Sequence, residues 1–131
     1  MNAVEVVTEA MNAFATGGIE ALARFYHADA VIVGGPYFGP KGTYRGGPEA
    51  LRGIMGDVEG AYDGFAVTPT LVRAGGDSDH VLVEGVVSYK SGAWRSWWVV
   101  GVRDGKIARL EIFHEGPPAL RATGLEDAGP P

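Results

Sequence analysis

Three polar residues in the second half of the chain, Glu84, Arg95 and His114, carry side chains that could take part in proton transfer. A carboxyl group shielded from water has a raised pKa, and a histidine has an ordinary pKa of about 6.5, so either can exchange a proton near neutral pH. A neighbouring arginine could stabilise negative charge that develops on an oxygen atom. These residue types lead to the hypothesis that His114 is the acid or base, supported by Glu84 and Arg95.

The three residues lie in a stretch that has the pattern of an antiparallel β-sheet. Apolar runs over residues 65–73, 80–90, 94–103 and 106–115 are separated by glycine-containing turns. Upstream, apolar residues at helical spacing predict helices over residues 4–14, 19–25 and 48–62, with Gly17 and Gly18 between the first two. A strand at 30–33 and a short helix or turn at 119–124 complete the prediction. Helices followed by a strand meander indicate an α+β fold with the helices on one face of the sheet.

Length and composition limit the classes of protein to consider. The 131 residues suit a single domain over residues 1–125, followed by a disordered tail at 126–131 that ends in Gly-Pro-Pro. A net charge of −5 with scattered basic residues argues against a nucleic-acid partner. The sequence has no membrane-spanning run and no signal-peptide pattern, so we expect a cytoplasmic protein. Without cysteine, and with three dispersed histidines, neither a metal nor another cofactor is expected.

Four segments resemble the SnoaL-like branch of the NTF2-like superfamily, whose fold is also called cystatin-like. They read GGIEALARFYHADAVIV (17–33), YRGGPEAL (44–51), DGKIARLEIF (104–113) and PPALRATGL (117–125). The resemblance implies an α+β cone in which a curved antiparallel sheet wraps around three N-terminal helices and encloses a central cavity. It further implies a bacterial protein of polyketide or other secondary metabolism, a homodimer through the convex sheet face, and a small hydrophobic, oxygenated ligand.

The chain departs from the best-known acid–base residues of this superfamily. Leu110 and Ile112 stand where SnoaL-like cyclases have a His-x-Asp pair, and the ketosteroid isomerase tyrosine and base fall near Ala10 and Gly35. None of these four residues can transfer a proton through its side chain. Two functions therefore stay open. One is a cofactor-free isomerase, cyclase, dehydratase or hydrolase, and the other is a non-catalytic ligand-binding or dimerisation module.

The family pattern also implies which strand residues face the cavity, because side chains alternate between the two faces of a sheet. On that basis Glu84, Arg95 and His114 are the polar residues of the cavity. Its apolar ligand contacts are expected from Phe14, Val86, Trp97, Val99, Leu110 and Ile112. Tyr44 and Phe38 are expected at the mouth, where the loop over residues 34–42 either closes as a lid or is a simple connection.

Each polar residue also has a structural interpretation. Glu84 and Arg95 fit a cross-strand ion pair near a sheet edge. His114, close to a strand end, fits a residue on the rim of the sheet. The two interpretations differ in whether the three side chains converge on one cavity.

Overall fold

The computed structural model describes residues 1–35, 39 and 41–125, so Phe38 and the expected tail at 126–131 lie outside the described residues. The chain begins with helix α1 (Ala3–Ala23), strands β1 (Tyr26–Val33) and β2 (Thr43–Arg45), and helix α2 (Pro48–Ala61). The meander follows as β3 (Ala66–Ala74), β4 (His80–Tyr89), β5 (Gly92–Arg103) and β6 (Lys106–Phe113), before the short helix α3 (Gly116–Ala122). No helix among the described residues is long and apolar enough to span a membrane.

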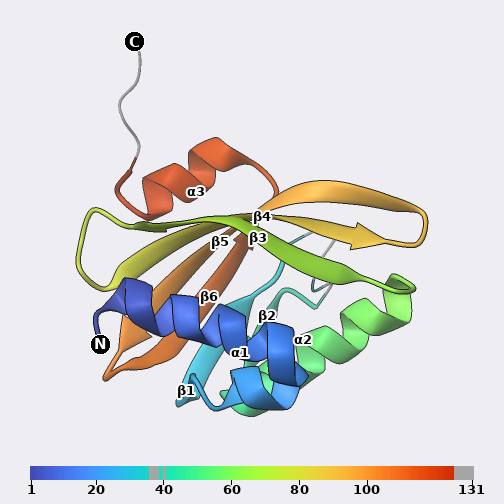
Figure 1. Cartoon of the computed structure of the whole chain (residues 1–131), viewed down its shortest axis with the longest axis horizontal. Helices are drawn as coiled ribbons and strands as arrows, with labels where there is room; N and C mark the ends of the chain where they lie inside the picture. Colours follow the sequence, from blue (N-terminus) through green and yellow to red (C-terminus); the bar gives the residue numbers. More distant parts are fainter. Residues whose placement is uncertain (36–38, 40, 126–131) are drawn as a thin grey trace.

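The six strands form one curved sheet in the order β2-β1-β6-β5-β4-β3 (Figure 1). The meander brings β6 beside β1, and these two strands run parallel, whereas the other neighbours are antiparallel. The α+β cone predicted from the sequence is confirmed, with a mixed sheet in place of a wholly antiparallel one. The parallel pair follows from connectivity, because β1 and β6 are joined through α2 and four other strands rather than by a hairpin.

Helix α1 has a defined start and an interruption near its end. At the start, the side chain of Asn2 accepts a hydrogen bond from the Glu5 backbone N–H at 2.8 Å, and the Glu5 carboxylate accepts one from the Asn2 N–H at 2.9 Å. Gly18 leaves the helical conformation with φ 73° and ψ −160°, a region that is essentially restricted to glycine. The helices predicted at 4–14 and 19–25 are therefore one kinked element.

The helices cover both faces of the sheet. Helices α1 and α2 lie against the concave face, and α3 lies on the opposite face (Figure 1). Beneath α3, Leu82, Val99 and Ala119 form a small buried cluster separate from the main core. The expectation of helices on one face was therefore wrong, because the sheet carries apolar residues on both.

Candidate ligand-binding site

A cavity of about 80 Å³ lies between the concave sheet face and helices α1 and α2. The strands of the meander contribute Val67, Val83, Trp98, Val100, Ile107, Leu110 and Ile112 to its lining. The helices contribute Met11, Phe14, Leu22, Leu51, Ile54 and Met55, and β1 contributes Tyr26. Nearly every lining group is a hydrocarbon or a thioether, so the cavity is suited to an apolar guest.

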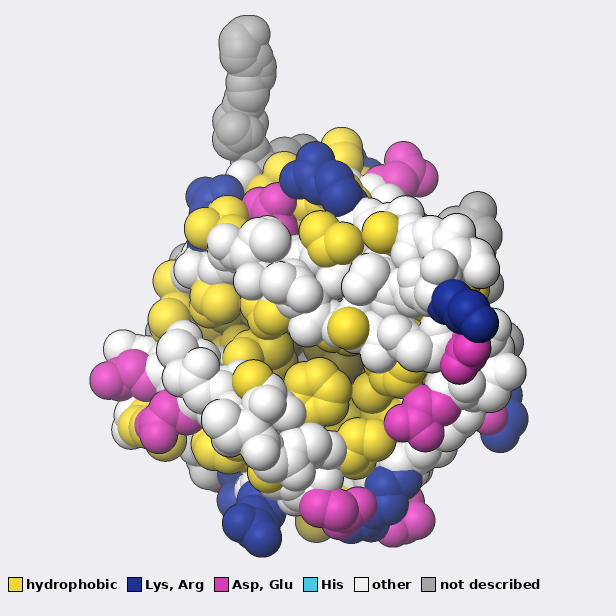
Figure 2. All heavy atoms as spheres, turned by 45° about the vertical axis from the view of Figure 1, so that its right-hand side comes forward, with side chains coloured by type: hydrophobic (Ala, Val, Ile, Leu, Met, Phe, Trp, Pro, Cys, Tyr) yellow, Lys and Arg dark blue, Asp and Glu magenta, His cyan; other side chains and the backbone are white. Residues whose placement is uncertain are grey.

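A larger hollow of about 570 Å³ adjoins this cavity and shares part of its lining, and we call it the vestibule. It lies between the kinked part of α1, the C-terminal half of α2 and the start of β3. Met11, Phe14, Met55 and Val67 line both the vestibule and the cavity, so they lie at the boundary between them, which we call the throat. Figure 2 shows hydrophobic side chains gathered in a hollow on this side of the molecule. The two spaces together can hold a molecule much larger than the cavity alone.

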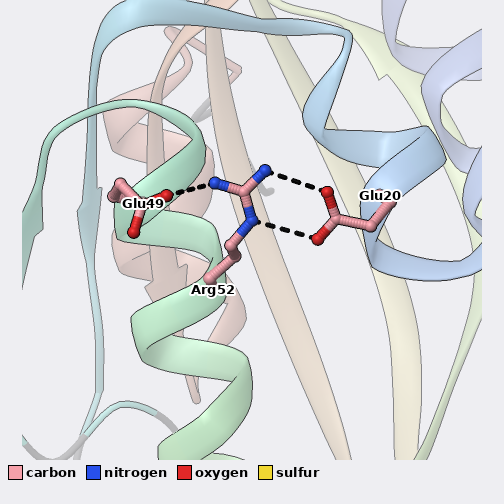
Figure 3. A network of polar contacts seen from close by, with 3 residues as sticks. All are labelled: Glu20, Glu49 and Arg52. Carbon is pink, nitrogen blue, oxygen red and sulfur yellow. Dashed lines mark hydrogen bonds and ion pairs between the residues drawn. The ribbon is translucent and has the colours of Figure 1, made fainter.

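An ion-pair network fixes the kinked end of α1 beside the vestibule (Figure 3). Arg52 on α2 donates from Nε and from Nη2 to the two carboxylate oxygens of Glu20, at 3.0 and 2.9 Å, and it also donates to Glu49. The bonds from Arg52 hold the pKa of the Glu20 carboxyl below its ordinary value, so this group is ionised at neutral pH. Glu20 and Glu59 are the charged side chains that line the vestibule among the residues described.

Trp98 takes up its position in the cavity because Gly85 has no side chain. A Cβ atom at Gly85 would lie 2.6 Å from Cζ3 of Trp98, which is closer than any real contact. The indole therefore lies flat against the backbone of β4, and Trp98 is buried. Any larger residue at position 85 would push the ring into the cavity.

Tyr26 brings a phenol hydroxyl to the lining of an otherwise apolar cavity. The residue is 5% exposed, and burial raises the pKa of its hydroxyl well above the ordinary value. The hydroxyl therefore keeps its proton at neutral pH and acts as a hydrogen-bond donor. Within the described part of the chain, no hydrogen bond joins it to another protein group.

The residues predicted to contact a ligand fall into two groups. Phe14, Leu110 and Ile112 line the cavity, as the sequence predicted. Val86, Trp97 and Val99 lie on the opposite face, because Val83 and Trp98 form the inward-facing pair of β4 and β5 while Glu84 and Trp97 form the next, outward-facing pair. The expected facing of these two strands was wrong by one residue.

Tyr44 has a structural role where the sequence predicted a place at the cavity mouth. Its ring is buried in the main core, and its hydroxyl donates to Oδ2 of Asp57 on α2 at 2.7 Å. Lys41 reaches the same carboxylate at 3.3 Å. These bonds tie the end of the loop over residues 34–42 to α2, and Tyr44 does not belong to the cavity lining.

The predicted acid–base residues do not converge. Glu84 and Arg95 form a cross-strand ion pair of 3.2 Å on the outer face, with the guanidinium 4.9 Å from the centre of the Trp97 ring. His114 lies just beyond β6, where its ring is in contact with the backbone of Gly35. The ion-pair interpretation is confirmed, and a catalytic role for the three residues stays a prediction that this arrangement does not favour.

Eleven of the fourteen lining residues were not among the ligand contacts expected from the sequence, and Tyr26 and Trp98 are two of them. Trp98 was missed because the sequence analysis assigned the wrong face of β5 to the cavity. The neighbouring Trp97 is also a tryptophan, so residue type could not correct the choice. Tyr26 falls between the predicted helix over 19–25 and the predicted strand at 30–33, and strand β1 begins four residues before the sequence indicates. A tyrosine among apolar residues carries no signal that separates a core position from a ligand contact.

Comparison with solved structures assigns the fold. An NTF2-like protein from Burkholderia thailandensis matches with 20% identity and a TM-score of 0.74, covering 97% of this chain and 99% of that one. TerC, co-crystallised with polyporic acid, matches with 19% identity and a TM-score of 0.72 over 95% and 98% of the two chains. A protein assigned as a polyketide cyclase from Sinorhizobium meliloti has 22% identity and a TM-score of 0.67 over 83% and 94%. At these identities the likeness establishes a shared fold.

The fold places the protein in the class of NTF2-like proteins, and the sequence identifies its family within that class. Residues 7–110 match the SnoaL-like domain family. This match spans most of the chain, so the protein belongs to the SnoaL-like family. No curated protein sequence matches it significantly.

Proposed function

We propose that this SnoaL-like protein binds a small, largely hydrophobic molecule in the cavity and the vestibule. The observation that carries the proposal is an apolar cavity in the interior next to a larger hollow, the two sharing the apolar lining residues Met11, Phe14, Met55 and Val67. Binding in an apolar space is favourable because it removes hydrocarbon surface of the ligand from water, which contributes about 25 cal/mol per Å² buried. TerC, which has a similar fold, was co-crystallised with polyporic acid. This supports the proposal that the present protein also binds a small molecule.

Binding without acid–base catalysis fits the lining better than the enzymatic alternative does. General acid–base catalysis needs a titrating group within hydrogen-bond reach of the substrate. Among the described residues, the cavity lining has Tyr26 as its one titratable side chain, and burial raises its pKa away from neutrality. The vestibule adds Glu59 and Glu20, and the bonds from Arg52 lower the pKa of Glu20, also away from neutrality. The Glu84–Arg95 ion pair lies on the other face of the sheet. These features support a binding module over a proton-transfer enzyme.

The proposal predicts that an apolar probe perturbs cavity residues and that blocking the throat abolishes the effect. Tetralin, a two-ring hydrocarbon, is titrated into protein labelled with ¹³C at isoleucine methyl groups, and Ile54, Ile107 and Ile112 report on the cavity. Met11→Trp places an indole in the throat, and we expect it to weaken binding at least tenfold while the protein stays folded. The substitution adds volume on a half-buried helix position, which the fold tolerates at a cost of about 1–3 kcal/mol.

Leu71→Trp is the matched control, because Leu71 is 42% exposed on β3 and lies outside both linings. It adds the same side chain without blocking the path, so the affinity for tetralin should stay at the wild-type value. If tetralin leaves the three isoleucine methyl signals unchanged in the wild-type protein, or if Met11→Trp binds it as well as wild type, the proposed binding site is wrong.

A further inference from the structure

We propose that the ligand is a neutral molecule with a carbonyl oxygen, and that this oxygen accepts a hydrogen bond from the hydroxyl of Tyr26 at the inner end of the cavity. The inference rests on the proposed binding function and adds the chemical class and the orientation of the ligand. It makes Tyr26 the residue that determines specificity.

The first argument is the position of Tyr26 in the cavity. It starts β1 and pairs with Ile107 of β6, another lining residue. Neither Tyr26 nor Ile107 takes part in the throat or the vestibule, so both belong to the inner part of the space. A ligand group that reaches Tyr26 therefore lies among the apolar side chains of the cavity, away from the charged side chains of the vestibule.

The second argument is that the hydroxyl has unused hydrogen-bonding capacity. A buried hydroxyl without a partner is costly, and nearly all such groups in folded proteins are satisfied. For Tyr26, which is 5% exposed, no bond to a protein group is present among the described residues. A tyrosine with a purely structural role would be hydrogen-bonded or would be replaceable by phenylalanine without consequence. An unsatisfied hydroxyl at the inner end of a cavity is instead suited to a polar atom of the guest.

The third argument concerns which polar atom fits. Trp98 supplies the other conventional hydrogen-bonding group among the lining side chains, and an indole N–H can only donate. The Tyr26 hydroxyl can donate or accept, whereas the indole N–H can only donate, so the ligand atom that suits both groups is an acceptor such as a ketone, aldehyde or ester oxygen. Because burial raises the pKa of Tyr26, its hydroxyl remains a donor over the whole physiological pH range.

The fourth argument excludes a carboxylate ligand. The described lining of the cavity contains no lysine, arginine or histidine that could compensate a buried negative charge. The vestibule through which a ligand passes has Glu20 and Glu59 as its charged side chains, and Glu20 is kept ionised by Arg52. Burying an unpaired carboxylate in such a site is strongly unfavourable. The described lining of the cavity also has no carboxylate that could pair with a buried ammonium group, so the part of the ligand that enters the cavity is neutral.

The test compares three probes of nearly equal shape, which are tetralin, 1-tetralone and 5,6,7,8-tetrahydro-1-naphthoate. Dissociation constants are measured at pH 7 by titration of the isoleucine methyl signals of wild type and Tyr26→Phe. One net hydrogen bond corresponds to about a three- to tenfold change in affinity. We expect wild type to prefer the ketone to the hydrocarbon by that factor, Tyr26→Phe to lose the preference while still binding tetralin, and the carboxylate to bind at least tenfold more weakly than the ketone.

Two further measurements separate a ligand contact from a structural role. Unfolding by urea without any probe should show Tyr26→Phe to be as stable as wild type, because the variant loses no hydrogen bond to a protein group among the described residues. Tyr62→Phe is the matched control, since Tyr62 packs against Tyr89 and Trp94 outside the cavity lining, and it should keep the wild-type ketone preference.

The outcomes distinguish this inference from the function on which it rests. If tetralin binds but Tyr26→Phe keeps the ketone preference, or if wild type has none, the role of Tyr26 is refuted and the apolar binding site stands. Equal affinity for the carboxylate and the ketone refutes the neutral class. If none of the three probes shifts the cavity methyl signals, both the inference and the binding function are refuted.

Discussion

The ring of His114 packs against the backbone of Gly35, just beyond the end of β6. This position is partly buried, and desolvation lowers the pKa of the imidazole below its ordinary value of 6.5. His114 is therefore neutral at pH 7 in the folded protein. Because burial disfavours the protonated form, this histidine binds a proton at a lower pH in the folded protein than in the unfolded chain. The free energy of unfolding therefore depends on pH.

The lowered pKa predicts an acid-sensitive contribution to stability. At pH 7.5 the imidazole is neutral in both states, and its contribution to the free energy of unfolding is fully present. As the pH falls below 6.5, the unfolded chain binds the proton first, so the free energy of unfolding decreases until the folded pKa is passed. His114→Gln cannot titrate and should lose less stability than wild type between pH 7.5 and 5. Urea unfolding at several pH values measures this, and parallel profiles for the two proteins would contradict it.

At the scale of elements, the kink at Gly18 shapes the vestibule. The residues that follow the kink include Ile19 and Glu20, which line the vestibule, and Arg52 holds Glu20 against α2. A continuous helix would carry these residues in another direction. The glycine at this point therefore directs the α1 wall of the ligand path, and the ion pair fixes it.

This account predicts opposite effects for two glycine-to-alanine substitutions in helices. Gly18→Ala forces a side chain onto φ 73°, ψ −160°, which costs on the order of 1–3 kcal/mol and should also weaken tetralin binding. Gly56→Ala lies in α2 at an exposed position with open space around it, and it should raise the free energy of unfolding by about 1 kcal/mol without changing binding. Urea unfolding and the methyl titration measure both. A stabilising Gly18→Ala would mean that the kink is not required.

The sequence predicted the positions of the helices and strands better than it predicted which face of each strand points into the core. Periodicity located both parts of α1, helix α2 and the four strands of the meander, because apolar spacing and glycine turns are local signals. The facing of β4 and β5 was missed because Leu82 and Val83, like Val99 and Val100, are apolar on both sides. The apolar outer side is covered by α3, a contact between segments distant in sequence. The candidate site inherited that error, so of the residues expected to contact a ligand, those on β6 and α1 line the cavity, and their contact with a ligand stays a prediction.

At the scale of the whole molecule, the sheet is a partition between two apolar compartments. The concave side holds the main core and the cavity, and the convex side holds the cluster of Leu82, Val99 and Ala119 under α3. Helix α3 is also attached through its end, since the Gly76 N–H donates to the carbonyl oxygen of Thr123 at 2.7 Å. A homodimer through the convex face stays a prediction. Helix α3 lies on that face, so it covers part of the surface that such a dimer would use.

If α3 is an integral layer, a charge on its inner side should destabilise the fold, while the same charge on its outer side should not. Ala119 is fully buried against the convex face, so Ala119→Asp would bury an unpaired carboxylate and should lower the free energy of unfolding by about 3 kcal/mol or more. Ala122→Asp is the matched control, because Ala122 is exposed on the same helix and should change stability by less than about 1 kcal/mol. Urea unfolding of both variants compares the two sides of one helix. Equal effects would show that α3 adds little to the stability of the sheet, leaving the convex apolar residues available for another partner.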